Sequence, residues 1–321
     1  MNFKRLENGL YDGFAIIKKF EKKISSKGSP YLDLILADKT GEISSKKWTV
    51  LPADENFQNE MIVKVRGEME VYNGRDQFRI NQMRPVTESD AVNMEELILC
   101  SPYDGARIYE QLTEKVQGFS DTDLKTIVLR SLENNKEKFL YYPAALRLHH
   151  AMRGGLAYHT ASIVKMAEQT AAVYPNIDRE LLISGAILHD LAKTWELEVG
   201  ATGMAKGYTV SGELIGHLVK GAMDLEMLGR ELGTDSEKLT LLQHMVLSHH
   251  GVPEYGSAVR PMFLEAEILS ALDNLDATIF EFNAALTNVE KGDFSDRQWA
   301  LENRKLFNHG RTENGHLAVL D

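Results

Sequence analysis

Apolar and polar residues alternate in short runs along the first 85 residues, as is typical of strands with one buried face. Turn-forming residues separate the runs at Lys27–Pro30, Asp38–Gly41 and Asn73–Gly74, and the Asn-Gly pair is a strong hairpin signal. The predicted strands are residues 13–20, 31–37, 42–48, 61–72 and 77–83. Five strands of this length predict a small β-barrel.

After Pro85 the spacing of apolar residues changes from two to between three and four, which predicts helices. The clearest are residues 161–174, 179–193, 212–232 and 263–286. The sequence therefore predicts a multidomain chain, with an all-β barrel over residues 1–88 and an all-α domain over residues 89–321. The core of the second domain is expected at about residues 145–290.

Composition favours a globular protein of a reducing compartment. The chain has 321 residues, 43% of them hydrophobic, and its single cysteine, Cys100, excludes a disulfide within one chain. The N-terminus does not resemble a signal peptide, and no apolar run approaches the length of about 18 residues that a membrane span needs. We expect a cytoplasmic protein without a membrane partner.

The charge is distributed unevenly between the two predicted domains. The net charge is −11, but residues 1–90 hold 15 Lys+Arg and 14 Asp+Glu, whereas the other residues hold 21 and 33. The acidic surplus thus lies in the helical part, and the near-neutral barrel could still attract a polyanion locally. Net charge therefore does not exclude a nucleic-acid partner.

Eight of the ten histidines fall within the predicted helical core. Imidazole nitrogens and carboxylate oxygens from several helices are the donors that a divalent ion prefers. A single histidine, or one His-Asp pair, is more often structural, but an ordered set favours a metal site. The proposed set is His159, His189, Asp190, His217, His249 and Asp273. Asp190 has two oxygens and could bridge two ions, which together can promote phosphodiester hydrolysis.

Lys193 follows Asp190 by three residues, so a helix would place both on one face. Its ammonium could hold a phosphate oxygen, although an ion pair with Asp190 or Glu196 is the simpler interpretation. His149 and His150 precede the set and could equally contact substrate or be structural.

A small five-stranded barrel could be an oligonucleotide/oligosaccharide-binding fold (OB-fold), which holds single strands with aromatic and basic side chains. Core packing is the simpler role for any one aromatic residue. The candidate nucleic-acid contacts are Tyr31, Lys47, Trp48, Tyr72, Arg75 and Arg79, with Lys46 and Phe78 considered beside them. The barrel could instead serve oligomerisation or substrate positioning.

The chain resembles the YhaM-type 3′-to-5′ exoribonucleases of Gram-positive bacteria, which pair an OB-fold with an HD-superfamily phosphohydrolase domain. The resemblance extends over almost the whole length. It is carried by the motifs at Lys27–Trp48, Val71–Arg84, His149–Thr160, Ile187–Leu197, Gly216–Gly221, His244–Gly251 and Arg260–Ala277.

This resemblance implies an ion held by His159, His189, Asp190 and Asp273, and a second ion at His217 and His249 bridged by Asp190. It also implies Mn²⁺ as the metal, a phosphate contact by Lys193 and a homo-oligomer. Asp190 and Lys193 are the catalytic candidates. Further candidate substrate contacts are His150, His250 and Arg260.

The leading functional prediction is a metal-dependent exonuclease that shortens single-stranded RNA, or single-stranded DNA, from a free 3′ end. One alternative is an HD-type phosphohydrolase of a cyclic dinucleotide or nucleoside polyphosphate, against which the barrel argues because a small substrate does not need it. The other is a non-catalytic nucleic-acid-binding factor with a structural metal, against which the second ion position argues.

Overall fold

The computed structural model describes residues 9–311 apart from Asn73, Leu148 and Ala201. The chain divides into two compact units, residues 1–100 with 200–202, and residues 101–199 with 203–321. The first unit thus extends beyond the expected boundary at residue 88, and within it the amide of Lys39 donates to the carbonyl of Glu96 over 3.3 Å. None of the helices in the described ranges is both long enough and apolar enough to cross a membrane.

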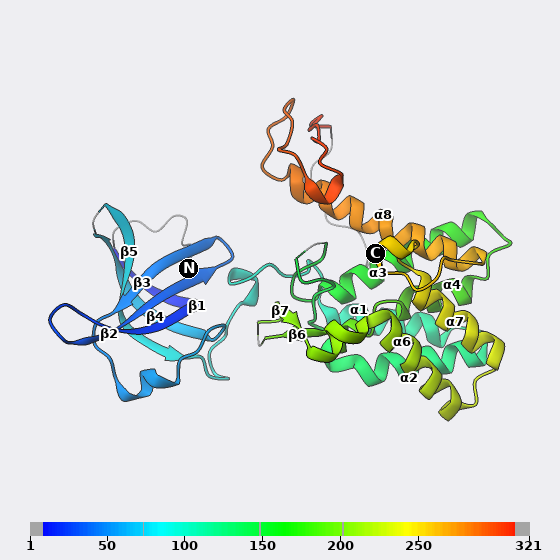
Figure 1. Cartoon of the computed structure of the whole chain (residues 1–321), viewed down its shortest axis with the longest axis horizontal. Coiled ribbons are helices and arrows are strands. Elements are labelled where there is room, and N and C mark those ends of the chain that lie inside the picture. Colours follow the sequence, from blue (N-terminus) through cyan, green and yellow to red (C-terminus); the bar gives the residue numbers. More distant parts are fainter. Residues whose placement is uncertain (1–8, 73, 148, 201, 312–321) are drawn as a thin grey trace. The chain divides into compact units, whose positions relative to one another are not determined.

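The first unit is a closed β-barrel, in blue and cyan in Figure 1. Its strand order is β1-β2-β3-β5-β4, with β4 pairing back to β1, and all neighbours are antiparallel except the parallel pair β3 and β5. This closed five-stranded arrangement is the OB-fold, and it confirms the predicted strands. The strands are β1 Leu10–Ile24, β2 Pro30–Asp38, β3 Gly41–Lys47, β4 Ile62–Tyr72 and β5 Arg75–Pro85.

Alternation along the strands fills the barrel. In β2, Leu32, Leu34 and Leu36 all point inward and are at most 2% exposed. Where β4 crosses β5, a Cβ on Gly67 would lie 2.2 Å from the Arg79 carbonyl oxygen, so only glycine fits this close approach. The predicted hairpin joins β4 to β5, although Asn73 lies outside the described residues.

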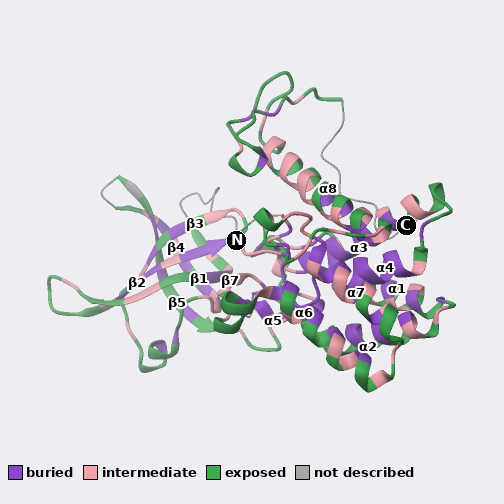
Figure 2. Cartoon of the chain, turned by 45° about the vertical axis from the view of Figure 1, so that its right-hand side comes forward, coloured by how far each residue is buried: buried purple, intermediate pink, exposed green. Residues whose placement is uncertain are grey.

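The second unit is helical and is built around one large apolar core. Side chains of aspartate cap the N-termini of four of its helices, α1, α2, α4 and α7. Helices α3 and α4 are the most deeply buried, with long purple stretches in Figure 2. The helices are α1 Gly105–Gln117, α2 Thr122–Phe139, α3 Gly155–Val173, α4 Arg179–Leu188, α5 Lys193–Glu196, α6 Val210–Leu232, α7 Ser236–Ser248 and α8 Leu264–Leu286.

The structure corrects the prediction of one helix over residues 179–193. Helix α4 ends at Leu188, a tight turn follows, and the single-turn helix α5 begins at Lys193. A short hairpin, β6 Leu197–Val199 with β7 Ala205–Tyr208, follows α5 and was not predicted, because these strands are too short to show alternation.

Helix α6 contains a sharp kink at Gly216, whose backbone has φ 75° and ψ 159°. An L-residue rarely adopts this conformation, so the glycine permits the break. A second helical segment then begins at His217. The kink therefore gives this histidine a helix start of its own.

Candidate metal centre

The six predicted metal ligands come from five helices of the second unit and their ends. His159 lies in α3, His217 follows the kink of α6, and Asp273 lies in α8. His189 ends α4 as its C-cap, and His249 does the same for α7. Asp190 begins the turn after α4. The sequence set is thus brought together in three dimensions.

A first group surrounds the Nε2 atom of His159. This nitrogen lies 3.2 Å from Asp273 Oδ1, 3.3 Å from His189 Nε2 and 3.5 Å from Asp190 Oδ2. His159 and His189 are fully buried. The ligand atoms of His159, His189 and Asp190 all lie within 4.8 Å of one another, close enough to share one metal ion.

A second group faces the other oxygen of Asp190. Asp190 Oδ1 lies 3.4 Å from His217 Nε2 and 3.5 Å from His249 Nε2. His250 completes this group, with its ring centre 4.4 Å from that of His249. The two oxygens of this carboxylate therefore face different imidazoles, as a bridging ligand would. His249 also lies close to His189 and Asp273, so the two groups adjoin each other.

Unpaired polar atoms in the second group indicate that its residues could hold a metal ion. Asp190 Oδ1, His217 Nε2 and His249 Nε2 are buried, and none has a hydrogen-bond partner among the described residues. A buried polar atom left unpaired costs about 1–3 kcal/mol. Three such lone pairs pointing at one another would be satisfied together by a cation.

The opposite ring nitrogen of each histidine is fixed by a hydrogen bond. His189 Nδ1 donates to the Ala186 carbonyl over 2.9 Å and His249 Nδ1 to the Val246 carbonyl over 2.7 Å. Because each Nδ1 carries the proton, each Nε2 presents its lone pair to the centre; these tautomers are assigned from the hydrogen bonds.

Two carboxylates that were not predicted orient the remaining histidines. Glu196 Oε1 accepts from His217 Nδ1 over 3.0 Å and from its backbone N–H over 2.9 Å. Asp276 Oδ2 accepts from His159 Nδ1 over 2.8 Å. In the sequence, the one available signal was that Asp276 follows Asp273 by one helical turn.

At His159 and at Asp190, burial and the neighbouring charges shift the pKa in opposite directions. Burial alone would lower the pKa of His159, but the flanking Asp273 and Asp276 raise it to about 10. Burial would raise the pKa of Asp190, but Lys193 and the histidines hold it well below its usual range. Asp190 is therefore an anion at neutral pH, as a metal ligand must be.

Lys193 Nζ lies 2.6 Å from Asp190 Oδ2, which is the ion pair that the sequence offered as the simpler interpretation. The side chain of Lys193 remains 12% exposed. Arg260, in contrast, is exposed and forms no ion pair or hydrogen bond with these groups in the described part of the chain.

His150, a candidate substrate contact, is buried and already bound to another side chain. It is 2% exposed, and its Nε2 donates to Asp276 Oδ2 over 2.7 Å. Its backbone has a φ of 54°, a left-handed conformation that no sequence pattern predicts. The neighbouring His149 is less buried, with its ring centre 5.7 Å from that of His159.

On the barrel, aromatic rings and one lysine form a cluster at the surface, which we call the barrel platform: Tyr31, Lys46, Trp48 and Tyr72. Tyr31 and Lys46 are half-buried. The rings of Tyr31 and Trp48 lie 4.9 Å apart, and Lys46 Nζ lies 5.5–5.7 Å from all three rings. Trp48 is 45% and Tyr72 59% exposed. The platform combines π-faces with a cation.

The structure corrects the prediction that Lys47 contacts nucleic acid. Strand β3 alternates, so Ile43, Ser45 and Lys47 point into the barrel while Lys46 points outward. Lys47 is 2% exposed and its Nζ pairs with Asp54 Oδ2 at 2.5 Å. It is therefore not available to bind phosphate.

Of the two predicted arginines, Arg79 lies on the surface, with Nη1 3.8 Å from Glu68 Oε1. The side chain of Arg75 lies outside the described part of the structure.

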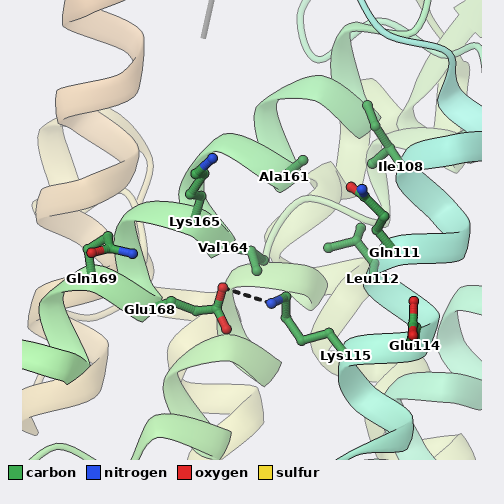
Figure 3. Close-up of a pocket in the computed structure, with 10 residues that line it drawn as sticks. All are labelled: Ile108, Gln111, Leu112, Glu114, Lys115, Ala161, Val164, Lys165, Glu168 and Gln169. Carbon is green, nitrogen blue, oxygen red and sulfur yellow. Dashed lines mark hydrogen bonds and ion pairs between the residues drawn. The ribbon is translucent and has the colours of Figure 1, made fainter. Parts of the chain in front are cut away.

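A separate hollow of about 420 Å³ lies between α1 and α3 (Figure 3). The ion pair of Lys115 Nζ and Glu168 Oε2, 2.7 Å apart, spans it. Its lining contains none of the predicted site residues.

The chain is similar to known proteins over most of its length. The model of the HD domain family matches residues 156–278. A 3′-5′ exoribonuclease YhaM of a Geobacillus species is 40% identical, over 92% of this chain and 91% of its own. The 3′-5′ exoribonuclease YhaM of Bacillus subtilis is 38% identical, over 92% of this chain and 94% of its own.

Two solved structures resemble about a quarter of the chain. The second OB-fold domain of replication protein A from Methanococcus maripaludis is 17% identical, covering 27% of this chain and 89% of its own, with a TM-score of 0.20. The mitochondrial single-stranded DNA binding protein Rim1 of S. cerevisiae is 13% identical, covering 25% and 97%, with a TM-score of 0.22. Scores this low support no conclusion about this chain. The full-length relatives do, and the chain belongs to the YhaM family of 3′-5′ exoribonucleases.

Proposed function

We propose that this chain is a metal-dependent 3′-to-5′ exonuclease, which hydrolyses phosphodiester bonds at the 3′ end of single-stranded RNA and accepts single-stranded DNA. The observation that carries the proposal is the position of Asp190, whose two oxygens face two sets of imidazole nitrogens. The named activity of the full-length relatives supports the same conclusion.

In this proposal His159, His189, Asp190 and Asp273 hold one divalent ion. His217 and His249 would hold a second, and Asp190 would be shared between the two. We propose Mn²⁺ as the ion. When bound, two such ions supply an activated water and charge stabilisation for the attacking and leaving oxygens.

The side chains of the centre orient the scissile phosphate. Lys193 Nζ, held 2.6 Å from Asp190 and partly exposed, would donate to a phosphate oxygen while keeping its ion pair. A cation fixed in this way needs little reorganisation as negative charge develops. His250 belongs to the second group but is not among the proposed ligands. Burial lowers its pKa to about 4, so it would meet the substrate as a neutral imidazole.

The barrel platform would hold the single strand. Exposed Trp48 and Tyr72 offer faces on which bases can stack, and Lys46 lies among the rings to meet a phosphate. Arg75 and Arg79 are proposed as further phosphate contacts. Residues 1–88 would thus act as the nucleic-acid-binding domain, and residues 89–321 as the phosphohydrolase domain.

The test is the degradation of a 5′-labelled single-stranded RNA with and without Mn²⁺. We expect a ladder that shortens from the 3′ end, which chelator and Asp190→Asn abolish. Asp224→Asn, at an exposed site of α6, is the matched control and should degrade RNA normally. An Asp190→Asn variant that remains fully active would refute the site assignment.

The same assay separates the two alternatives. Turnover of a cyclic dinucleotide or nucleoside polyphosphate without loss of RNA would indicate a small-molecule phosphohydrolase. Binding of RNA without hydrolysis of any of these substrates would indicate a non-catalytic factor.

We also propose that the chain forms a homo-oligomer in the cytoplasm. After the kink of α6, Val219, Met223 and Met227 follow each other at intervals of four and are 42%, 50% and 70% exposed. Such an apolar stripe on a soluble surface favours burial against another molecule. Light scattering of the wild type and of Met223→Lys tests this: the variant should have the lower mass.

The single cysteine and an RNA substrate support the proposed cytoplasmic location.

A further inference from the structure

Asp276 is a buried carboxylate one helical turn after Asp273 in α8, and it is 6% exposed. It does not face the two groups of the metal centre directly. Its Oδ2 accepts from His159 Nδ1 over 2.8 Å and from His150 Nε2 over 2.7 Å, and its Oδ1 accepts from the Ser162 hydroxyl. Three donors thus converge on one side chain.

These contacts determine which nitrogen of His159 keeps its proton when the other nitrogen loses its own to bind a metal ion. An ionised carboxylate can only accept hydrogen bonds, so His159 must present N–H at Nδ1. Its Nε2 then points at Asp273 Oδ1, 3.2 Å away, and Asp190 Oδ2, 3.5 Å away. A carboxylate behind a ligating histidine fixes the orientation of the ring and increases its basicity.

The surroundings of Asp276 are costly to maintain. His150 has a left-handed backbone, with φ 54°, and its buried Nδ1 has no hydrogen-bond partner within the described ranges. A strained backbone and an unpaired buried nitrogen each cost about 1–3 kcal/mol. Both accompany the hydrogen bond from His150 Nε2 to Asp276, which is therefore formed at a local cost.

A matching arrangement exists on the other side of Asp190. Glu196 Oε1 accepts from His217 Nδ1 over 3.0 Å, whereas His189 and His249 use backbone carbonyls. Each group of the centre therefore contains one histidine oriented by a carboxylate. This symmetry offers an internal comparison, because the two carboxylates serve different groups.

We propose that Asp276, held by Ser162 and His150, is a positioning residue that sets the metal affinity of the His159 group. The proposal rests on the metal site proposed above. The oxygens of Asp276 already accept from His150, His159 and Ser162, so we assign Asp276 an effect through His159 and not a ligand role. Its loss should therefore weaken one ion position and leave the other.

Mn²⁺ binding to the full chain, measured by calorimetry and by electron paramagnetic resonance, tests this. Asp276→Asn keeps the shape but removes the charge, and we expect about 10- to 100-fold weaker binding of one ion. Glu196→Gln is the matched comparison and should weaken the other ion. In a His159→Ala background, Asp276→Asn should have no further effect, because its route of action is gone.

Both Mn²⁺ ions binding to Asp276→Asn with wild-type affinity would overturn the proposal, as would an undiminished effect in the His159→Ala background. A wild type that binds no Mn²⁺ would instead refute the proposed metal site. If Asp276→Asn does not fold, as judged by circular dichroism, Ser162→Ala replaces it. This variant removes one of the three donors and should weaken the same ion by about threefold or more, as expected for the loss of one neutral hydrogen bond. Unchanged affinity there would also overturn the proposal.

Discussion

The buried pair of Lys47 and Asp54 should stabilise the barrel strongly, and replacing Lys47 by methionine tests this. Both side chains are 2% exposed. Lys47 Nζ donates to Asp54 Oδ2 over 2.5 Å and to the Thr49 carbonyl over 2.6 Å, and the Leu51 amide donates to Asp54 over 2.7 Å. Methionine fills a similar volume but leaves Asp54 as a buried charge without its cation.

Removing one partner of a buried ion pair costs about 3–5 kcal/mol. With a urea dependence of about 1.5 kcal/mol/M for a domain of this size, the unfolding midpoint of the barrel should fall by about 2–3 M. The double variant Lys47→Met with Asp54→Asn should recover most of this loss, since asparagine is neutral and still accepts from the Leu51 amide.

Fluorescence of Trp48 during urea denaturation measures the effect, in a full chain where Trp195 and Trp299 are phenylalanine so that the signal reports on the barrel. Lys46→Met is the matched control: it should leave the midpoint unchanged and weaken RNA binding. A Lys47→Met variant within about 1 kcal/mol of the wild type would refute the reasoning.

Three further predictions address binding, metal and pH. Trp48→Ala should raise the KM for single-stranded RNA about tenfold with little change in kcat, because stacking contributes about 1–3 kcal/mol per base; the exposed Trp299→Ala is the control, and an equal effect of both would contradict the platform. Adding Mn²⁺ to chelator-treated protein should stabilise the helical unit by about 2.7 kcal/mol at a hundredfold excess over Kd, seen as a higher Tm without a shift in the Trp48 signal. Glu180 accepts from the backbone amides of Ser120 and Asp121 over 2.8 and 2.9 Å, and its pKa is lowered although burial acts to raise it. A lowered pKa stabilises the fold above the unfolded value of about 4.3 and ceases to do so as the pH falls. Glu180→Gln should therefore cost about 1 kcal/mol at pH 7 and progressively less as the pH falls below the unfolded value, as measured by urea denaturation over this range. A cost that does not change with pH would contradict a role for the ionised carboxylate.

The sequence predicted those parts of the molecule that have a local pattern. Alternation predicted the five strands, and the order of histidines and aspartates predicted the six residues that converge in space. It failed at Lys47 because Ser44 and Ser45 in β3 are both polar, so the segment does not show which face is inward. The register became clear only from the pairing with β2.

Long-range contacts account for the other differences. Asp276 and His159 are far apart along the chain and meet because α8 packs against α3, which no motif expresses. Glu196 reaches His217 because Gly216 breaks α6, and His150 turns inward through a left-handed backbone. Each depends on tertiary packing or on a backbone conformation that the sequence does not encode locally.

The parallel contact between β3 and β5 is the shortest seam in the barrel, with only the pairs Ser45–Phe78 and Lys46–Arg79. Every other neighbouring pair of strands is joined along at least seven residues. The barrel should therefore open first between β3 and β5, and the backbone amides there should show the fastest hydrogen exchange. Lys46 and Arg79 stand opposite each other across this seam. A bound single strand that contacted both residues would hold β3 and β5 together, so the barrel should open less often when nucleic acid is bound.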